Sequence, residues 1–373
     1  MVYLDYSATT PVDERVIESY SEACRKFVGN PNSLHKIGVE AKEVIDASTK
    51  QIADILGVKP SEIIYTSGAS EANNTAIKGI CLKYQNRGKR IISTELEHSS
   101  IIAPLNYLSS LGFDVDFVKL DEKGRVDLED LERLMDDDVI LVSISSVNSE
   151  VGIKQPIEEI SKIVRKYKKC FFHSDMTQSI GKEKVDLSLV DLASLSGQKF
   201  FGMKGVGALI KKENIVIEPL IHGGKSTTIY RSGTPALPLI VSLAKAMRLA
   251  YDDFDNKQNH IKEVHDYLID KLSKLDVDIN SNEISINQVV NFSLRNIKSE
   301  TMLHALEEDE IYISTQTACS VSDYSKAVYA VTKDKERSKS SLRISLSYLT
   351  TKEEIDTFID SFGKHLKQLD FRR

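Results

Sequence analysis

Short apolar runs alternate with amphipathic helical stretches between about residues 60 and 210. Strands that are joined by helices form parallel sheets with helices on both faces. The alternation therefore predicts an α/β fold around a mainly parallel sheet, and 373 residues are enough to bury such a core. The strand-like runs are IIYT, KRIIS, FDVDFVKLD, DVILVSISS, CFF and LASLS.

The pattern changes after about residue 256. INQVVNFSL and SSLRISLSYLT alternate apolar and polar residues with a period of two, and helical patterns lie at 299–308 and 352–369. Period-two alternation is typical of half-buried strands in an antiparallel sheet. We therefore predict a large domain at 14–255 and a small α+β domain formed by 1–13 and 256–373.

Composition excludes several classes of protein. The net charge of −6 argues against a general nucleic-acid surface. Asp5 lies where a signal peptide would be apolar, and no run approaches a membrane span, so we expect a cytoplasmic protein without membrane contact. The four cysteines have no paired spacing and the eight histidines are scattered, so no disulfide framework and no structural metal are expected.

A lysine follows the last apolar run, in LASLSGQKFFGMKGVG. Burial at a strand end would desolvate Lys199 and leave a nucleophilic amine, whereas an exposed Lys199 would be a solvated turn residue. Asp175 ends an earlier run, in CFFHSD. An imine-forming lysine and a carboxylate that pairs with a pyridinium nitrogen are the two groups that pyridoxal 5'-phosphate (PLP) requires.

The turn Ser67-Gly68-Ala69-Ser70 joins a strand-like run to a helical stretch. Backbone N–H groups at a helix start form a phosphate site, to which Ser70 could add a hydroxyl, although Ser70 is equally an ordinary N-cap. His98 follows the next run and either faces the ligand crevice of the sheet or simply starts a helix.

Two further candidates lie near the C-terminus. Cys319 stands in a polar, lysine-containing segment, where a thiol is expected to be exposed and to ionise as a nucleophile must. Arg343 begins a strand and could grip a carboxylate with its planar guanidinium. The alternatives are a stray surface cysteine and a surface ion pair.

With these residues in place, the chain resembles the cysteine desulfurases of the NifS/IscS type, in the class V aminotransferase group of fold-type-I PLP enzymes. The resemblance spans nearly the whole chain. It implies a large domain with a mainly parallel, seven-stranded-type sheet, a smaller α+β domain, a homodimer and a PLP cofactor. It rests on the blocks YLDYSATTPV, GNPNSLH, TSGASEANN, TELEHSSI, NSEVGIKQPI, HSDMTQSIGK, SGQKFFGMKGVG, RSGTPALP, TACS and LRISL.

The resemblance also implies residue roles. Lys199 would link covalently to the cofactor, and Cys319 would take sulfur from L-cysteine as a persulfide, leaving L-alanine. An iron–sulfur scaffold or a tRNA-thiolation enzyme would then accept the sulfur. The other roles are Asp175 at the ring nitrogen, Gln178 at the phenolic oxygen, His98 on the ring face, Ala69, Ser70 and Ser196 at the phosphate, Thr234 at the phosphate of the partner subunit, Arg343 at the substrate carboxylate, and Asn148 and Ser149 beside the substrate.

The sequence departs from the family at several positions. Gln198 stands where a histidine usually precedes the lysine, Ser149 replaces an asparagine, and Met176 replaces a small residue beside the ring. Two alternatives to a cysteine desulfurase follow. One is a selenocysteine lyase, and the other is a weakly active paralogue that acts as a scaffold for sulfur transfer.

Overall fold

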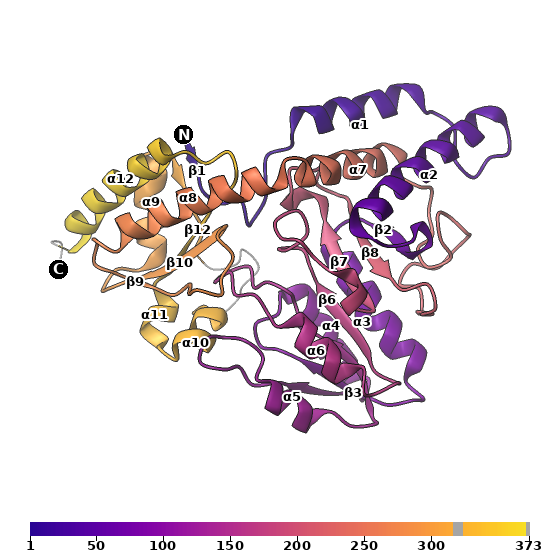
Figure 1. Ribbon diagram of the computed structural model, residues 1–373, viewed down its shortest axis with the longest axis horizontal. Coiled ribbons are helices and arrows are strands. Elements are labelled where there is room, and N and C mark those ends of the chain that lie inside the picture. Colours follow the sequence, from indigo (N-terminus) through magenta and orange to yellow (C-terminus); the bar gives the residue numbers. More distant parts are fainter. Residues whose placement is uncertain (316–323, 371–373) are drawn as a thin grey trace.

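The computed structural model describes residues 1–315 and 324–370, which form two lobes (Figure 1). The larger lobe is built on a seven-stranded sheet. The smaller lobe, on the left of the view, contains the first and last described elements, β1 (Val2–Tyr3) and α12 (Lys352–Asp370). A long helix, α8 (Phe254–Leu272), leads from the larger lobe into the smaller one.

The large sheet has the strand order β2-β8-β7-β6-β5-β3-β4. β8 runs antiparallel to both of its neighbours, and the pairs from β7 to β4 are parallel. The prediction of a mainly parallel sheet is therefore confirmed. The strands are β2 (Ile63–Thr66), β3 (Arg90–Ser93), β4 (Asp114–Phe117), β5 (Val139–Ser143), β6 (Phe171–Asp175), β7 (Leu192–Ser196) and β8 (Gly207–Lys211).

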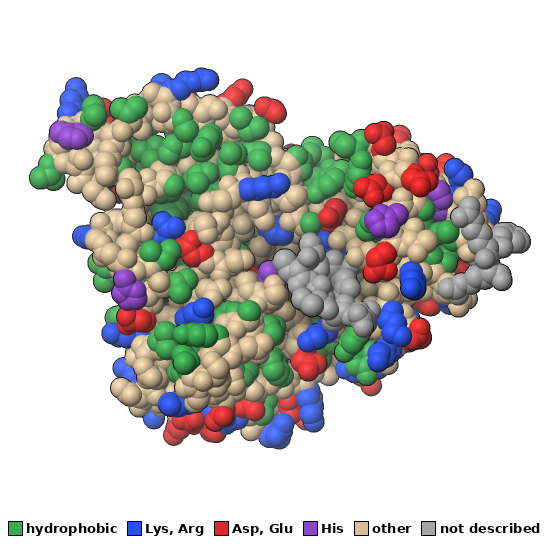
Figure 2. Space-filling view, turned by 180° about the vertical axis from the view of Figure 1, so that it is seen from behind, with side chains coloured by type: hydrophobic (Ala, Val, Ile, Leu, Met, Phe, Trp, Pro, Cys, Tyr) green, Lys and Arg blue, Asp and Glu red, His purple; other side chains and the backbone are tan. Residues whose placement is uncertain are grey.

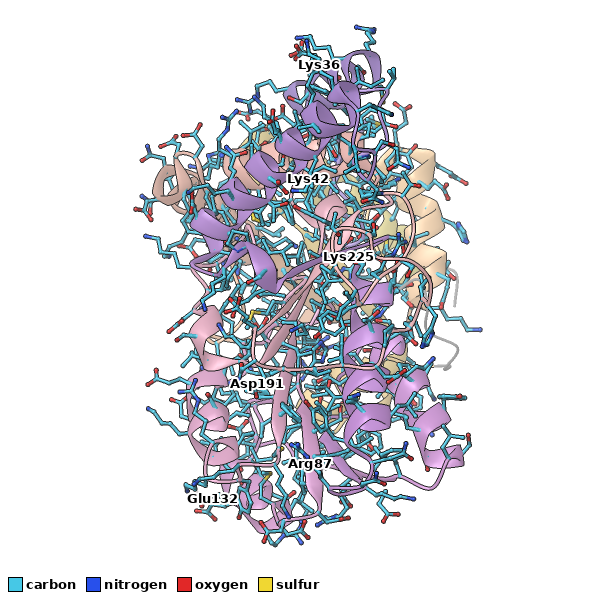
Figure 3. The ribbon with its side chains drawn as sticks, turned by 90° about the vertical axis from the view of Figure 1, so that its right-hand side faces the viewer. Lys36, Lys42, Arg87, Glu132, Asp191 and Lys225 are labelled. Atoms are coloured by element: carbon cyan, nitrogen blue, oxygen red, sulfur yellow. The ribbon has the colours of Figure 1, made fainter. Side chains whose placement is uncertain are left out.

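Helices cover both faces of this sheet. Successive strand residues point to opposite faces and therefore pack in different apolar cores. Ile63 and Ile92 pack in one apolar cluster, whereas Ile64 and Ile91 pack in another. In Figure 3, Lys36 of α2 is labelled at one end of the molecule, and Arg87 and Glu132 are labelled near the other. The helices are α1 (Glu14–Lys26), α2 (Lys36–Leu56), α3 (Ala69–Tyr84), α4 (Ser99–Ser110), α5 (Leu128–Leu134), α6 (Ile157–Val164) and α7 (Leu237–Tyr251).

The smaller lobe joins the N-terminal segment to the C-terminal part of the chain. Val2 and Leu4 pack in one core with Phe292 and Phe358. An antiparallel sheet has the order β12-β10-β9, and β1 pairs in parallel with β11 (Ile311–Tyr312). The remaining elements are β9 (Val277–Ile279), β10 (Val289–Leu294), β12 (Ser341–Ser345), α9 (Ser299–Glu308), α10 (Lys326–Thr332) and α11 (Lys335–Lys339).

The expectation that these strands are half-buried is wrong, because every residue of β10 and β12 is buried. Their polar faces are covered and hydrogen-bonded. Asn280 donates to Asn291, Ser293 donates to the Arg337 carbonyl, and the Ser345 hydroxyl accepts from the backbone N–H of Ser7. Polar alternation here marks an internal hydrogen-bonding face instead of a solvated one.

The sequence predicts one long helical pattern from near Pro238 through about Leu275, but the structure interrupts it. α7 ends at Tyr251, and α8 starts after Asp253, whose φ of 52° lies in the left-handed region. The chain therefore changes direction at Asp252-Asp253, where the two lobes meet (Figure 1).

Candidate active site

A cleft of about 370 Å³ lies at the carboxyl ends of the parallel strands, beside the N-terminal segment. Ligands bind at this edge in open α/β sheets. The structure brings nearly all of the predicted site residues to this cleft. Those that line it are Ala69, Ser70, His98, Asn148, Ser149, Asp175, Gln178, Ser196, Gln198, Lys199 and Arg343.

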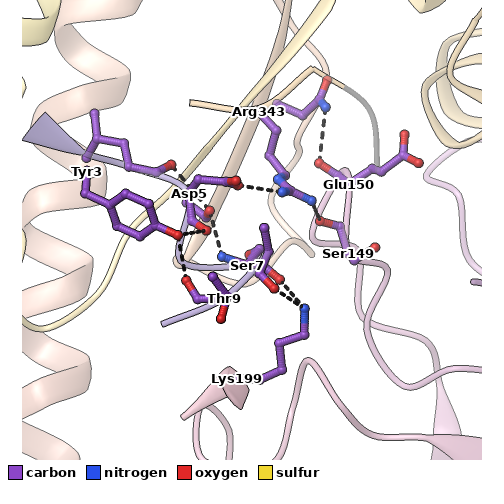
Figure 4. A network of polar contacts seen from close by, with 12 residues as sticks. Tyr3, Asp5, Ser7, Thr9, Ser149, Glu150, Lys199 and Arg343 are labelled. Carbon is purple, nitrogen blue, oxygen red and sulfur yellow. Dashed lines mark hydrogen bonds and ion pairs between the residues drawn. The ribbon is translucent and has the colours of Figure 1, made fainter. Parts of the chain in front are cut away.

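Lys199 reaches the cleft from a short 3₁₀ turn directly after β7. Its Nζ atom donates to the carbonyls of Ser7 and Ala8, each at 2.7 Å (Figure 4). The preceding residue, Gln198, accepts at its carbonyl from the backbone N–H and the hydroxyl of Thr10, at 2.9 and 3.0 Å. The N-terminal segment therefore fixes both the lysine and the turn that carries it.

Asp175 ends β6, on the strand beside the lysine strand. Its carboxylate accepts from the Asn73 Nδ2 atom at 2.8 Å and from the backbone N–H of Thr177 at 2.9 Å. Each carboxylate oxygen of Asp175 therefore has a donor, and the carboxylate is held in a fixed orientation at the cleft wall.

His98 is the N-cap of α4 and lines the cleft. Its Nδ1 atom lies 2.8 Å from the Ser100 hydroxyl and accepts from the Ser100 backbone N–H at 3.1 Å. Burial lowers the pKa of His98, with Lys199 acting in the same direction and Asp175 and Glu150 opposing it. A neutral imidazole that accepts at Nδ1 carries its proton on Nε2.

The predicted phosphate turn precedes α3. Gly68 is the N-cap of this helix, and within the described structure no side chain makes a capping hydrogen bond at this end. A Cβ atom at Gly68, whose φ is 153°, would lie 3.5 Å from the Ser196 hydroxyl. The glycine thereby keeps open the space between the helix start and Ser196.

Arg343 lies in β12 and is only 3% exposed. Its guanidinium donates to Asp5 at 2.7 Å from Nη2 and to the Ser149 carbonyl at 3.0 Å from Nη1 (Figure 4). Arg343 is therefore buried, and two acceptors fix the orientation of its guanidinium. The alternative of a surface ion pair does not apply. It lines the cleft from the smaller lobe and bridges both lobes.

Gln178 and Asn148 are fixed by the chain around them. Gln178 donates to the Ser7 carbonyl at 3.0 Å and accepts from the buried Lys182. Asn148 donates to the Leu96 carbonyl at 3.0 Å, and its side-chain oxygen accepts from two backbone N–H groups. The Asn148 side chain thus shapes the loop after β5 and turns its polar atoms toward the backbone.

Three residues singled out in the sequence are not placed in this cleft. Thr234 is exposed in the loop before α7 and does not line the cleft of its own chain. Met176 is buried in the core cluster of the large lobe and is not among the residues that line the cleft. Cys319 lies outside the described residues.

The structure adds residues that sequence reasoning missed. Asn73, Ser100 and Asp5 contact the predicted groups directly, and Glu97, the residue before His98, is buried. Their signal was their place in the blocks TSGASEANN, TELEHSSI and YLDYSATTPV, where at most two residues had been given a role.

Two searches of the described residues found nothing. No group of three or more His, Cys, Asp or Glu side chains in 1–315 and 324–370 could hold a metal ion. In the same ranges, no helix combines the length and the apolar character that crossing a bilayer requires.

Comparisons with known proteins agree with this geometry. The family model described as Aminotransferase class-V matches residues 2–358. The chain is 36% identical over 375 residues to cysteine desulfurase IscS of Dictyoglomus turgidum, covering 99% of this chain and 95% of that protein.

Two solved structures show the same fold. A NifS-like protein has a TM-score of 0.93 at 38% identity, covering 98% of this chain and 99% of that one. SspA in complex with cysteine has a TM-score of 0.83 at 30% identity, covering 94% of this chain and 100% of that one. The chain therefore belongs to the class V aminotransferases and, within them, to the cysteine desulfurases of the NifS/IscS type.

Proposed function

We propose that this protein is a PLP-dependent cysteine desulfurase, which moves the sulfur of L-cysteine to Cys319 and releases L-alanine. One observation carries the proposal. A strand-end lysine, a carboxylate, an uncapped helix start and a buried arginine line a single cleft, on four separate segments of the chain. The solved structure of a relative, SspA, is that of a complex with cysteine, which supports this amino acid as the substrate.

The residues present fit PLP. The open space at Gly68 lies beside the first turn of α3, where backbone N–H groups suit a phosphate. Asp175 would supply the carboxylate for the ring nitrogen, and Lys199 the amine for the aldehyde. Ala69, Ser70 and Ser196 would contact the phosphate, and Gln178 and His98 the ring. Gln198, which precedes Lys199 in the turn after β7, would also contact the cofactor.

The bound cofactor would supply an electron sink for the substrate's α-carbon. Arg343 would hold the substrate carboxylate, and Ser149 and Asn148 would shape the wall beside it. Lys199 would supply the amine that moves the α-proton. His98, with its proton on Nε2, can hold or donate a proton on the cleft side.

Sulfur transfer needs a thiol as the nucleophile, and none lines the cleft among its described residues. We assign that role to Cys319. Its thiolate would attack the substrate sulfur. An S–S bond forms and the C–S bond of the substrate breaks. The carbon that carried the sulfur takes a proton, so that cysteine becomes alanine and Cys319 becomes a persulfide. An acceptor protein, such as an iron–sulfur scaffold or a tRNA-thiolation enzyme, would then remove the outer sulfur.

We also propose a homodimer in which Thr234 contacts the phosphate bound by the partner subunit. Thr234 is exposed and lies outside its own cleft, as a residue with that role would. Exposed apolar residues support the same arrangement. Figure 2 shows hydrophobic side chains gathered over the end of the molecule that carries α1 and α2. Those exposed around the α1–α2 junction are Val28, Leu34, Ile37 and Val39.

The function is tested by incubating the purified protein with L-cysteine, measuring alanine, and analysing the Cys319 peptide by mass spectrometry. We expect a mass gain of one sulfur. Lys199→Ala should lose the visible absorbance of the cofactor, and Cys319→Ser should keep it but lose sulfur transfer. Sulfur transfer that persists in Cys319→Ser would contradict the proposal. Faster turnover of selenocysteine than of cysteine would favour a selenocysteine lyase.

A further inference from the structure

Asn73 hydrogen-bonds to the Asp175 carboxylate and, through the Ser100 hydroxyl, is linked to His98. It lies in α3 with 0% of its surface exposed. Its Nδ2 atom donates one hydrogen to Asp175 Oδ2 at 2.8 Å and the other to the Ser100 hydroxyl at 2.9 Å. One amide group is therefore shared between the carboxylate of β6 and the start of α4.

The direction of each hydrogen bond in this chain is fixed. The side-chain nitrogen of Asn73 can only donate, so Asn73 donates to the Asp175 carboxylate. The Ser100 hydroxyl already accepts from Asn73 and has a single hydrogen of its own, which it can donate to His98 Nδ1 at 2.8 Å. The Ser100 backbone N–H reaches the same nitrogen. His98 Nδ1 is thereby kept as an acceptor.

The arrangement has a cost that packing alone does not explain. The Oδ1 atom of Asn73 is buried and has no hydrogen-bond partner within the described part of the chain. An unpaired buried acceptor destabilises the folded protein. Turning the amide over would aim this oxygen at the Asp175 carboxylate, and both donors would be lost. The fold thus accepts an unpaired oxygen in order to keep both donors where they are.

We propose that Asn73 is a positioning residue that fixes the Asp175 carboxylate at the cleft wall and, through Ser100, keeps His98 Nδ1 an acceptor, with the proton of the ring on Nε2. This inference deepens the proposed function, in which Asp175 pairs with the ring nitrogen and His98 serves the reacting centre. Other charged or titratable groups also face this pair. They are Lys199 after β7, Glu150 after β5, Glu97 before α4 and His173 on β6.

The first test is Asn73→Leu, which keeps the size of the side chain and removes both donors. Asn74→Leu is the matched control, because Asn74 is the next residue of the same helix and its side chain donates to the Ser70 carbonyl, away from Asp175 and Ser100. Loss of a charge-assisted hydrogen bond to Asp175 should weaken cofactor binding by about tenfold or more. Fluorescence titration of the cofactor-free proteins with PLP measures this. Equal affinities in the two folded variants would overturn the Asp175 part of the inference.

The second test follows His98 in the cofactor-free protein, by NMR of ¹⁵N-labelled histidine, with its signal assigned by loss in His98→Gln. Ser100→Ala removes a donor that stabilises the neutral ring, so the pKa of His98 should rise by about one unit. Ser100→Thr restores the hydroxyl and should restore the titration. An unchanged His98 titration in Ser100→Ala would overturn the relay, even if Asn73→Leu fails to fold. Neither result depends on turnover of cysteine, so failure of the proposed function would be seen separately.

Discussion

At the scale of single residues, the cleft depends on charges that are buried with a partner. Asp5 and Arg343 are 338 residues apart in the chain and form an ion pair of 2.7 Å. A buried guanidinium without such a partner would be strongly destabilising. The Ser149 carbonyl takes a second hydrogen bond, so the plane of the guanidinium is set from two sides. This orientation prepares Arg343 for a planar carboxylate.

Replacing Arg343 by lysine should therefore affect substrate binding more than turnover. Lysine keeps the charge but cannot form two parallel hydrogen bonds, so the KM for cysteine should rise by about tenfold or more while kcat changes less. Steady-state kinetics of alanine formation measure both constants. Arg337→Lys is the control, because Arg337 binds Asn280 and the Ile279 carbonyl away from the cleft. An equal KM for Arg343→Lys and the unchanged protein would contradict this role.

Glu97 predicts a pH-dependent stability. Burial raises its pKa from 4.5 to about 7, although Ser145 and Thr94 donate to the carboxylate. A raised folded-state pKa means that the folded protein binds the proton more tightly than the unfolded chain. The stabilisation is complete below pH 4.5 and is lost as the pH rises through 7. The loss should be about 3 kcal/mol.

Urea unfolding of Glu97→Gln and of the unchanged protein, between pH 4.5 and 8, measures this loss. Glutamine does not ionise, so the variant should gain stability relative to the unchanged protein as the pH rises. His173, whose pKa burial lowers to about 4, gives the opposite slope in both proteins and cancels in the difference. A difference that stays constant over this pH range would show that Glu97 ionises as it does in water.

The sequence predicted the site residues that carry a motif but missed those that support them. Lys199 and Asp175 follow apolar runs, and this local signal is visible without a structure. Asn73 acts on Asp175 across 102 residues, and no local pattern distinguishes it from Asn74. Its importance arises only when the sheet order places α3 against the end of β6. Residue roles that depend on such contacts between distant elements cannot be predicted from one sequence.

At the scale of elements, the turn between β2 and α3 depends on a close approach of two backbones. A Cβ atom at Gly207, the first residue of β8, would lie 2.8 Å from Gly68 Cα and 2.4 Å from the Leu195 carbonyl. Neither neighbour can yield, because both belong to the backbone of paired strands or of the turn itself. β8 therefore holds the proposed phosphate turn in place.

Gly207→Ala should displace this turn, lower the unfolding free energy by about 1–3 kcal/mol and weaken PLP binding. Denaturant unfolding and fluorescence titration with PLP measure the two effects. Gly224→Ala is the matched control, because a Cβ atom there meets nothing within 4 Å. If Gly207→Ala bound PLP as tightly as Gly224→Ala does, the turn would not depend on β8.

Element prediction succeeded where periodicity and burial agree. Six strands of the large sheet, β2 to β7, were predicted from their apolar runs, and all but the partly exposed edge strand β4 are largely buried. The buried strand β8 was not predicted. The break between α7 and α8 was missed, because apolar spacing continues on both sides of Asp252-Asp253, and the extended backbone of Asp252 and the left-handed backbone of Asp253 end the helix. The buried polar faces of β10 and β12 were mistaken for solvated ones, since the sequence does not show what covers a strand.

At the scale of the whole molecule, the N-terminal segment ties the two lobes together around the cleft. Its first residues belong to the core of the smaller lobe. Ser7 and Ala8 then bind Lys199, and Thr10 binds Gln198, on the larger lobe. The cleft therefore forms only when both lobes are in place. The domain boundaries at 13/14 and 255/256 remain predictions.

The proposed dimer is the property of the whole molecule that is most directly testable. Leu34 is 97% exposed in the loop between α1 and α2, and burying one leucine side chain stabilises a contact by about 1.5–3 kcal/mol. Leu34→Asp would instead place a charge there, so the protein should shift from dimer to monomer in sedimentation velocity. PLP affinity should fall in parallel, because Thr234 would no longer reach the partner's phosphate site. Leu111→Asp is the control, since Leu111 is 46% exposed at the end of α4, away from this junction. A Leu34→Asp protein that stays dimeric, or a monomer that binds PLP with undiminished affinity, would contradict the shared site.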